Sequence, residues 1–163
     1  MKRYLTYMLS FALLGFTSCE GFLDTDVPSI DQHTFFSGEQ TAYSALVGIY
    51  DPAGWMEYIQ FLDWAIGDVV SDDATKGGGG DSDQPQIYDL EHFRATPEMA
   101  TLSTVWEQNY EGINRANRLI EGLKDNTAVK EDVCKRFIAE ARFMRGYYYF
   151  CLIKIFGAVP IVD

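Results

Sequence analysis

The sequence predicts an all-α protein, and two observations support this fold class. Four segments repeat apolar residues at steps of three and four, the spacing of one face of a helix. No segment of any length shows the period-two alternation of a strand. We therefore expect antiparallel helical pairs with a long irregular loop between them. The length of 163 residues suits one domain or part of a larger one.

The composition indicates a globular protein with an acidic surface. Hydrophobic residues make up 47% of the chain and charged residues 23%, which argues against disorder of the whole chain. Asp and Glu number 24 against 13 Lys and Arg, a formal net charge of −11. This balance argues against a nucleic acid partner, because phosphate binding requires a basic surface.

Residues 1–18 are predicted to be a lipoprotein signal peptide. Two basic residues precede an apolar run, Tyr4–Phe16, that reaches only about 20 Å as a helix, too short for a hydrocarbon core of about 30 Å. A secretory signal is therefore favoured over a membrane-spanning helix. The run ends in Ser18-Cys19, which resembles a bacterial lipobox and makes Cys19 the predicted site of lipid attachment. A plain secretory signal followed by a structural cysteine is the alternative.

A tether and the first two helices follow the signal peptide. Residues 19–33 are polar and contain Pro28, so we interpret them as a tether that leads away from the membrane. Helical spacing predicts helices over residues 34–50 and 55–70, separated by a turn at 51–54 that contains Pro and Gly.

Residues 71–97 are predicted to be irregular. Four successive glycines, Gly77–Gly80, cannot hold a helix, since each costs about 1 kcal/mol relative to alanine. Pro85 and Pro97 lie in the same stretch. Loops of this length are usually functional or disordered. Aspartates flank the glycines without the spacing of an EF-hand, so a solvated acidic loop is favoured, and calcium binding stays open.

The two longest helices are expected over residues 98–123 and 128–156. The predicted buried face of the first comprises Met99, Leu102, Trp106, Tyr110, Ile113, Asn117 and Ile120. That of the second comprises Phe137, Ala141, Met144, Tyr148, Leu152 and Ile155. The second half of the later helix is apolar on all sides, so it is expected to be buried on most sides. Gly157 and Pro160 should end it.

Several polar or reactive residues of these helices are interpreted as structural. Cys134 and Cys151 lie about 25 Å apart along the later helix, too far for a disulfide. Four others recur at three-residue steps and are expected to bond to the backbone or to neighbouring helices: Asn114, Asn117, Arg142 and Arg145.

The two long helices also resemble a known family, the SusD/RagB nutrient-uptake lipoproteins. The first helix carries the resemblance through Trp106, Tyr110, Ile113, Asn114, Asn117 and Ile120. The segment from Ala139 to Phe150, followed by residues 156–160, is similar to the most recognisable segment of that family. The opening residues 19–24 and the block 34–50 are similar to it as well.

This resemblance implies a fold, a location and partners. The fold would consist of tetratricopeptide-like helical pairs beside a more irregular ligand-binding region. The protein would be an outer-membrane lipoprotein that faces the cell exterior. It would capture oligosaccharides, or in some members peptides, and deliver them to a TonB-dependent (SusC-like) porin. Members of the family are much longer, so residues 34–163 would be the N-terminal helical region of a larger protein.

The residues themselves do not indicate an enzyme. His33 and His92 are the only histidines and lack the spacing of metal ligands. The order of Lys76 and the glycines after it is wrong for a phosphate-binding loop. We therefore predict no catalytic residue, no cofactor and no metal site. A fragment of a secreted hydrolase is a further alternative, and it would require a pair of carboxylates in a cleft.

The candidate ligand-binding residues lie in the stretch 71–97. Aromatic faces cover the apolar side of a sugar ring, while planar polar groups bond to its hydroxyls. We predict Tyr88 as a stacking face, with Asp89 or Arg94 as a partner for hydroxyl groups. Other aromatic residues outside the predicted core are Trp55, Tyr58, Trp64 and Phe93. The alternative function is a helical-repeat scaffold that binds only protein partners.

Overall fold

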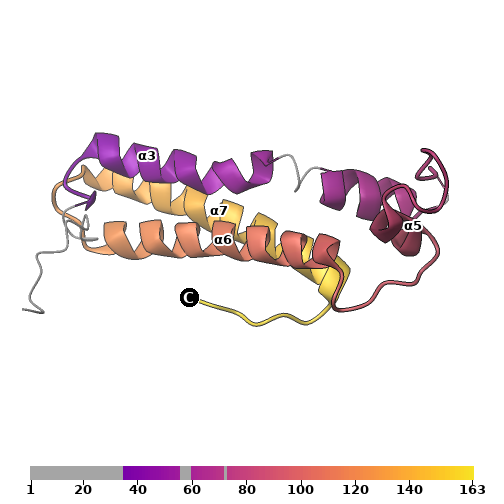
Figure 1. Ribbon diagram of the computed structural model, residues 1–163. Helices are drawn as coiled ribbons and strands as arrows, with labels where there is room; N and C mark the ends of the chain where they lie inside the picture. The colour runs from indigo at the N-terminus through magenta and orange to yellow at the C-terminus, as the bar shows by residue number, and fades with distance from the viewer. Residues whose placement is uncertain (1–34, 56–59, 72) are drawn as a thin grey trace, which may run out of the picture. The chain divides into compact units, whose positions relative to one another are not determined.

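The structure is a computed structural model that describes residues 35–55, 60–71 and 73–163. Its elements are α3 (Glu39–Tyr50), η1 (Asp51–Gly54), η2 (Gln60–Val69), α5 (Pro85–Glu91), α6 (Ala100–Lys124) and α7 (Glu131–Phe156). η1 is a 3-10 helix and η2 a π-helix, and these ranges contain no strand. The all-α prediction is therefore confirmed for the described residues (Figure 1). The predicted signal peptide, Cys19 and the tether lie outside them.

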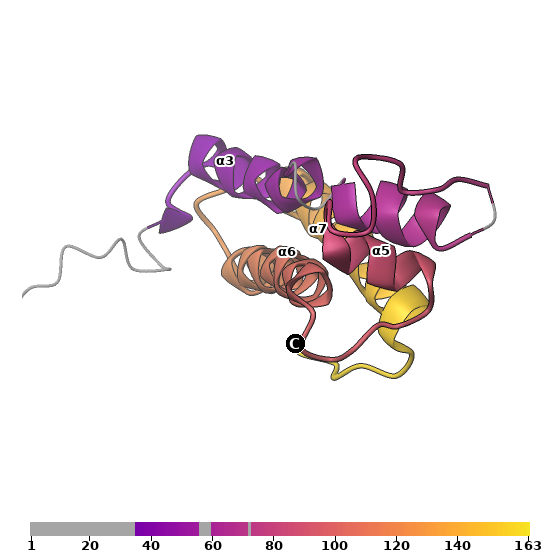
Figure 2. The same cartoon turned by 45° about the vertical axis from the view of Figure 1, so that its right-hand side comes forward.

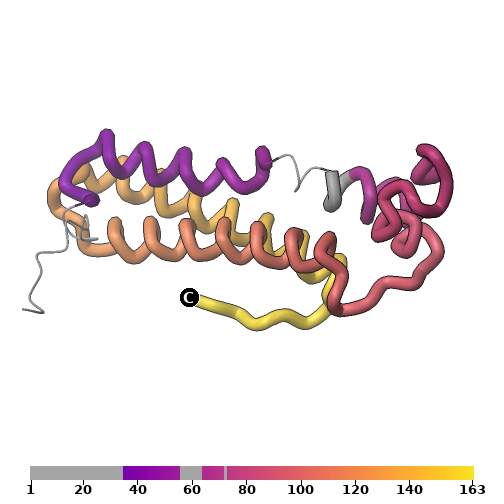
Figure 3. The backbone as a smooth tube through the Cα atoms, viewed as in Figure 1, coloured from indigo at the N-terminus to yellow at the C-terminus, as the bar shows by residue number. Residues whose placement is uncertain are grey.

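Three helices form the main bundle. α6 and α7 are joined by a short turn and run antiparallel, and α3 lies along both of them (Figure 1, Figure 2, Figure 3). The core between them includes Phe36, Leu46, Ile49, Leu119, Phe137, Tyr148 and Leu152, all buried. The predicted helices are confirmed with later starts, at Glu39, Ala100 and Glu131. Among the helices described, none is long and apolar enough to span a bilayer.

The predicted buried face of α6 is confirmed at Met99 and Ile113 but is otherwise displaced by about one residue position. The innermost residues are Thr101, Val105, Asn109, Gly112, Ile113, Ala116, Leu119 and Leu123. Trp106, Tyr110 and Ile120 are only half-buried at the edge of this line. At the closest approach to α7 the reason is steric, because Gly112 leaves room for the ring of Tyr148. A Cβ atom on Gly112 would lie 2.3 Å from the ring of Tyr148.

The predicted buried face of α7 is confirmed from Phe137 to Leu152. The expectation that its second half is buried on most sides is wrong for the described chain. Phe150 and Ile153, both in this half, are 55% and 50% exposed. α3 and α6 both pack against the same half of the α7 surface, so no other helix of the described chain covers the opposite half. Cys134 and Cys151 are buried free thiols on this helix, as predicted.

The segment after α7 folds back along the bundle. Gly157, at φ +71°, ends the helix as predicted. The Tyr110 hydroxyl then donates to the carbonyl of Pro160 at 2.8 Å, and the Asn117 side chain donates to that of Val162 at 2.9 Å. Asn117 also accepts a hydrogen bond of 2.8 Å from Arg145 of α7. The structural interpretation of Asn117 and Arg145 is therefore confirmed, whereas Asn114 and Arg142 lie exposed.

η2 and α5 pack together around a smaller cluster of buried residues, formed by Ala65, Val69, Ile87, Leu90 and Met99. The prediction that residues 71–97 are irregular throughout is therefore wrong, because α5 lies inside this stretch. Pro85 does not interrupt the chain there. It occupies the start of α5, where a backbone N–H would make no hydrogen bond within the helix, so the lack of an N–H in proline costs nothing. The helix predicted over residues 55–70 is described from Gln60.

Candidate functional site

The predicted ligand residues lie together at the C-terminal end of α5. Tyr88 and Asp89 belong to the helix, and Arg94 follows it. The Arg94 guanidinium lies 3.2 Å from the Asp89 carboxylate and 4.9 Å from the centre of the Tyr88 ring. The His92 ring lies 4.2 Å from the Tyr88 ring, and its Nδ1 is 2.9 Å from the Tyr88 carbonyl oxygen. The helix end therefore gathers aromatic, cationic and anionic groups within one short segment.

Tyr88 is not the open ring of this group. Its side chain is half-buried, and both His92 and Arg94 lie against its ring. Phe93, in contrast, is 79% exposed, the highest exposure among the large hydrophobic residues of the described chain. Phe93 is therefore the aromatic side chain most accessible to a ligand at this place.

The backbone at Phe93 is strained. The N–H of Arg94 donates to the carbonyl of Asp89 at 2.7 Å, and that of Phe93 donates to Leu90 at 3.0 Å. This pair of bonds is a Schellman motif, in which glycine usually takes the left-handed position. Here Phe93 takes it, with φ +54°. A side chain in this conformation costs about 1–2 kcal/mol, and such a solvent-exposed ring recovers little of that cost through burial. Strain of this kind clusters at binding sites.

A groove begins directly after this turn. It has a volume of about 480 Å³ and is lined by Ala95, Thr96, Pro97, Leu102, Ser103, Trp106, Glu107 and Phe156. Trp106, predicted to be core, is half-buried and lies edge-on to Phe156, with ring centres 5.1 Å apart. An indole ring beside one carboxylate and two hydroxyl side chains suits the mixed polar and apolar surface of a sugar. Sequence reasoning missed this groove because its residues come from three separate segments.

The other predicted aromatic candidates do not join this group. Trp55 is half-buried beneath the Arg115 guanidinium, which lies 5.5 Å from the centre of the Trp55 rings. Trp64 is half-buried against the cluster of η2 and α5. Tyr58 lies outside the described residues.

The glycine-rich segment is held by two charged side chains. The Lys76 ammonium donates to the carbonyls of Gly77 at 3.1 Å and Gly80 at 2.7 Å. The Asp83 carboxylate accepts from the N–H of Gly79 at 2.9 Å. Gly77, Gly78 and Gly80 have positive φ, which explains the run of glycines. Across the residues that the structure describes, no three potential metal ligands come together.

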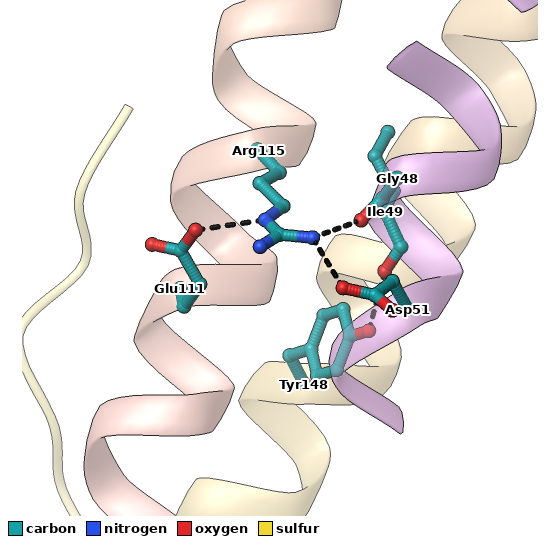
Figure 4. Close-up of polar contacts among 6 residues, drawn as sticks. All are labelled: Gly48, Ile49, Asp51, Glu111, Arg115 and Tyr148. Carbon is teal, nitrogen blue, oxygen red and sulfur yellow. Dashed lines mark hydrogen bonds and ion pairs between the residues drawn. The ribbon is translucent and has the colours of Figure 1, made fainter. Parts of the chain in front are cut away.

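A second polar cluster fastens α3 to α6 and α7 (Figure 4). Arg115 donates to the carbonyl of Gly48 and the carboxylate of Asp51, both at 2.8 Å, and to Glu111 at 2.7 Å. Burial lowers the Arg115 pKa, but the hydrogen bonds to Glu111 and Asp51 outweigh burial and raise the pKa above its ordinary value. The Tyr148 hydroxyl donates to the carbonyl of Ile49, and burial raises its pKa to about 12. The carboxylates of Asp51 and Glu111 are both bound to Arg115. The role of this cluster is therefore structural, because it holds the end of α3 against α6.

Comparison with known proteins decides the family. The sequence profile described as "Starch-binding associating with outer membrane" matches residues 21–163. The chain belongs to the SusD-like family. A SusD-like protein of Bacteroides ovatus is 28% identical over 167 residues, which cover 100% of this chain and 29% of the relative. SusD-like protein P38 of Formosa agariphila is 25% identical over 99% of this chain and 31% of its own length.

This SusD-like chain corresponds to only part of its relatives. It spans about 30% of the length of the curated relatives it matches. No solved structure matches it significantly. The profile describes binding proteins associated with the outer membrane, a non-enzymatic family, in agreement with the prediction that no catalytic residue is present.

Proposed function

We propose that this chain is part of a cell-surface lipoprotein that captures oligosaccharides and delivers them to a TonB-dependent, SusC-like porin of the outer membrane. The acyl anchor would be attached at Cys19, with the protein facing the cell exterior. The helices would form tetratricopeptide-like pairs that hold the ligand-binding turn. The main support for this proposal is the strained and exposed Phe93 beside a groove with sugar-compatible side chains.

The proposed binding surface extends from Phe93 into the groove. Phe93 provides an apolar face for one sugar ring, and Trp106 provides a second aromatic surface inside the groove. Asp89 and Arg94 are the partners for sugar hydroxyls, because both side chains remain about half exposed, at 44% and 54%. Tyr88 holds Arg94 in position through the contact with its guanidinium. The described residues thus provide one wall of a site in a larger protein.

The test is calorimetric titration of the complete gene product with a panel of oligosaccharides. Phe93→Gly is the informative variant because it should have opposite effects on stability and on binding. Glycine fits the left-handed position, so the melting temperature should rise by several degrees. Loss of an aromatic face worth about 1–1.5 kcal/mol should weaken binding of the best ligand about tenfold.

Phe93→Trp is the matched control, because it retains an aromatic face and should retain the affinity. Tyr88→Ala should weaken binding less than Phe93→Gly does, since it acts through Arg94. If Phe93→Gly binds every oligosaccharide as tightly as the wild type, the turn after α5 is not part of the site.

The alternative function is a scaffold that binds only protein. One observation favours it, the row of exposed apolar side chains on α7, which suits another polypeptide better than a sugar. Recovery of the porin with the purified protein, together with no heat of binding for any oligosaccharide, would establish this alternative.

A further inference from the structure

The outer face of α7 carries an apolar stripe that α3 and α6 leave open. It consists of Phe143, Gly146, Tyr147, Phe150 and Ile153, which recur at steps of three and four and so lie on one side of the helix. Phe143, Phe150 and Ile153 are 71%, 55% and 50% exposed. Such a stripe is typical of a helix face that packs against another helix.

α3, which packs beside α7, also carries exposed apolar side chains. Tyr43, Val47 and Tyr50 are exposed along one side of α3. The Tyr43 ring lies 6.2 Å from that of Phe137 on α7, and burial together with the Glu140 carboxylate of the same helix raises the pKa of Tyr50. Exposed groups of large apolar side chains mark interaction sites rather than ordinary surface.

Gly146, in the middle of the stripe, is not explained by the packing of the chain. Glycine inside a helix destabilises it relative to alanine unless a close contact requires the missing side chain. Gly112 has such a contact, because the Tyr148 ring occupies the space of a Cβ. At Gly146 nothing in the described chain lies within 4 Å of the Cβ position. A glycine on an open helix face allows the close approach of another backbone.

We infer that the stripe is the docking site of an amphipathic helix that crosses α7 at Gly146 and belongs to the same SusD-like polypeptide. The relatives are long enough to supply it, since the matched region covers only 29% to 31% of their length. Arg142 and Lys154 lie exposed beside the two ends of the stripe. The docking helix should therefore present apolar residues at steps of three and four, with acidic residues at its rim.

A second copy of the chain fits the stripe less well. A two-fold interface pairs the same patch on both subunits, so the stripe would run antiparallel to itself. Pairing about its midpoint, between Phe143 and Ile153, brings Arg142 of one copy towards Lys154 of the other. Like charges opposite one another disfavour that arrangement.

The test uses the complete gene product with a photo-crosslinking amino acid in place of Phe150, followed by mass spectrometry of crosslinked peptides. We expect crosslinks within one polypeptide, to a helical segment outside residues 1–163. Lys135, 74% exposed near the start of α7, is the control position and should not crosslink to that segment. A crosslinked dimer, a crosslink only to another protein, or no crosslink at position 150 would each overturn the inference.

A second variant, Gly146→Leu, distinguishes a covered stripe from an open one, because the melting temperature should change in opposite directions in the two cases. Leucine is a far better helix former than glycine, so Gly146→Leu should raise the melting temperature of the complete product if this face meets only water. If another helix crosses at Gly146, the added side chain blocks its approach. We then expect a lower melting temperature and at least a tenfold loss of the crosslink. A raised melting temperature would contradict the inference, and neither readout depends on glycan binding.

Discussion

The close contact of α6 with α7 makes Gly112→Ala a sensitive test of the packing. Alanine is the better helix former by about 1 kcal/mol, so propensity alone predicts a more stable protein. The structure predicts the reverse. The new Cβ would lie 2.3, 2.4 and 2.6 Å from three carbons of the Tyr148 ring, whereas carbon atoms in contact sit about 3.5–4 Å apart.

Tyr148 cannot easily yield this space, because its side chain is fully buried and its hydroxyl is bonded to the carbonyl of Ile49. Overpacking of a core typically costs about 1–3 kcal/mol. Taking the upper end, because the overlap exceeds 1 Å, and subtracting the propensity gain, we expect a loss of about 2 kcal/mol in the free energy of unfolding.

Urea unfolding followed by far-ultraviolet circular dichroism measures this change directly. Gly48→Ala is the matched control, since Gly48 is also helical but nothing lies within 4 Å of its Cβ position. It should stabilise the protein by about 0.5–1 kcal/mol. If both variants gain stability to the same extent, the close approach of the two helices is refuted.

Two further predictions concern Tyr148 and Cys19. Burial raises the Tyr148 pKa from 10.0 to about 12, so the neutral phenol is favoured by folding. The contribution of Tyr148 to the free energy of unfolding should be constant well below pH 10 and fall by up to about 2.7 kcal/mol in total as the pH rises from below 10 to above 12, and Tyr148→Phe should remove that part of the decline. Cys19→Ala should abolish incorporation of a clickable fatty acid, and labelling equal to the wild type would exclude Cys19 as the lipid site.

The helices could be predicted from the sequence where large apolar residues form their buried faces. α7 is the clearest case, because Phe137, Met144, Tyr148 and Leu152 repeat at helical steps and all are buried. On α6 the same rule selected the edge of the interface, since the largest side chains lie there. Its centre also includes Asn109, Gly112 and Ala116, small or polar residues that a search for large apolar side chains does not select.

α5 was missed for a different reason. It has 7 residues, too few for a hydrophobic period to stand out, and only Ile87 and Leu90 are buried. Pro85 and the preceding glycines suggested an irregular segment. The helix forms because its two apolar residues complete a cluster with Ala65 and Val69 of η2, which is a tertiary effect that local sequence does not contain.

The candidate site could likewise be predicted only in part, because some of its features depend on the folded backbone rather than on the local sequence. Tyr88, Asp89 and Arg94 could be selected from their chemical types, and their proximity follows from a helix end. Phe93 could not be ranked above Tyr88, because only the backbone shows that it takes a left-handed position suited to glycine. Nothing in a phenylalanine favours that conformation, so the exposure of its ring needs a reason outside the described chain. A ligand that covers the ring would supply one, and Phe93→Gly separates the gain in stability from the loss of binding in a single variant.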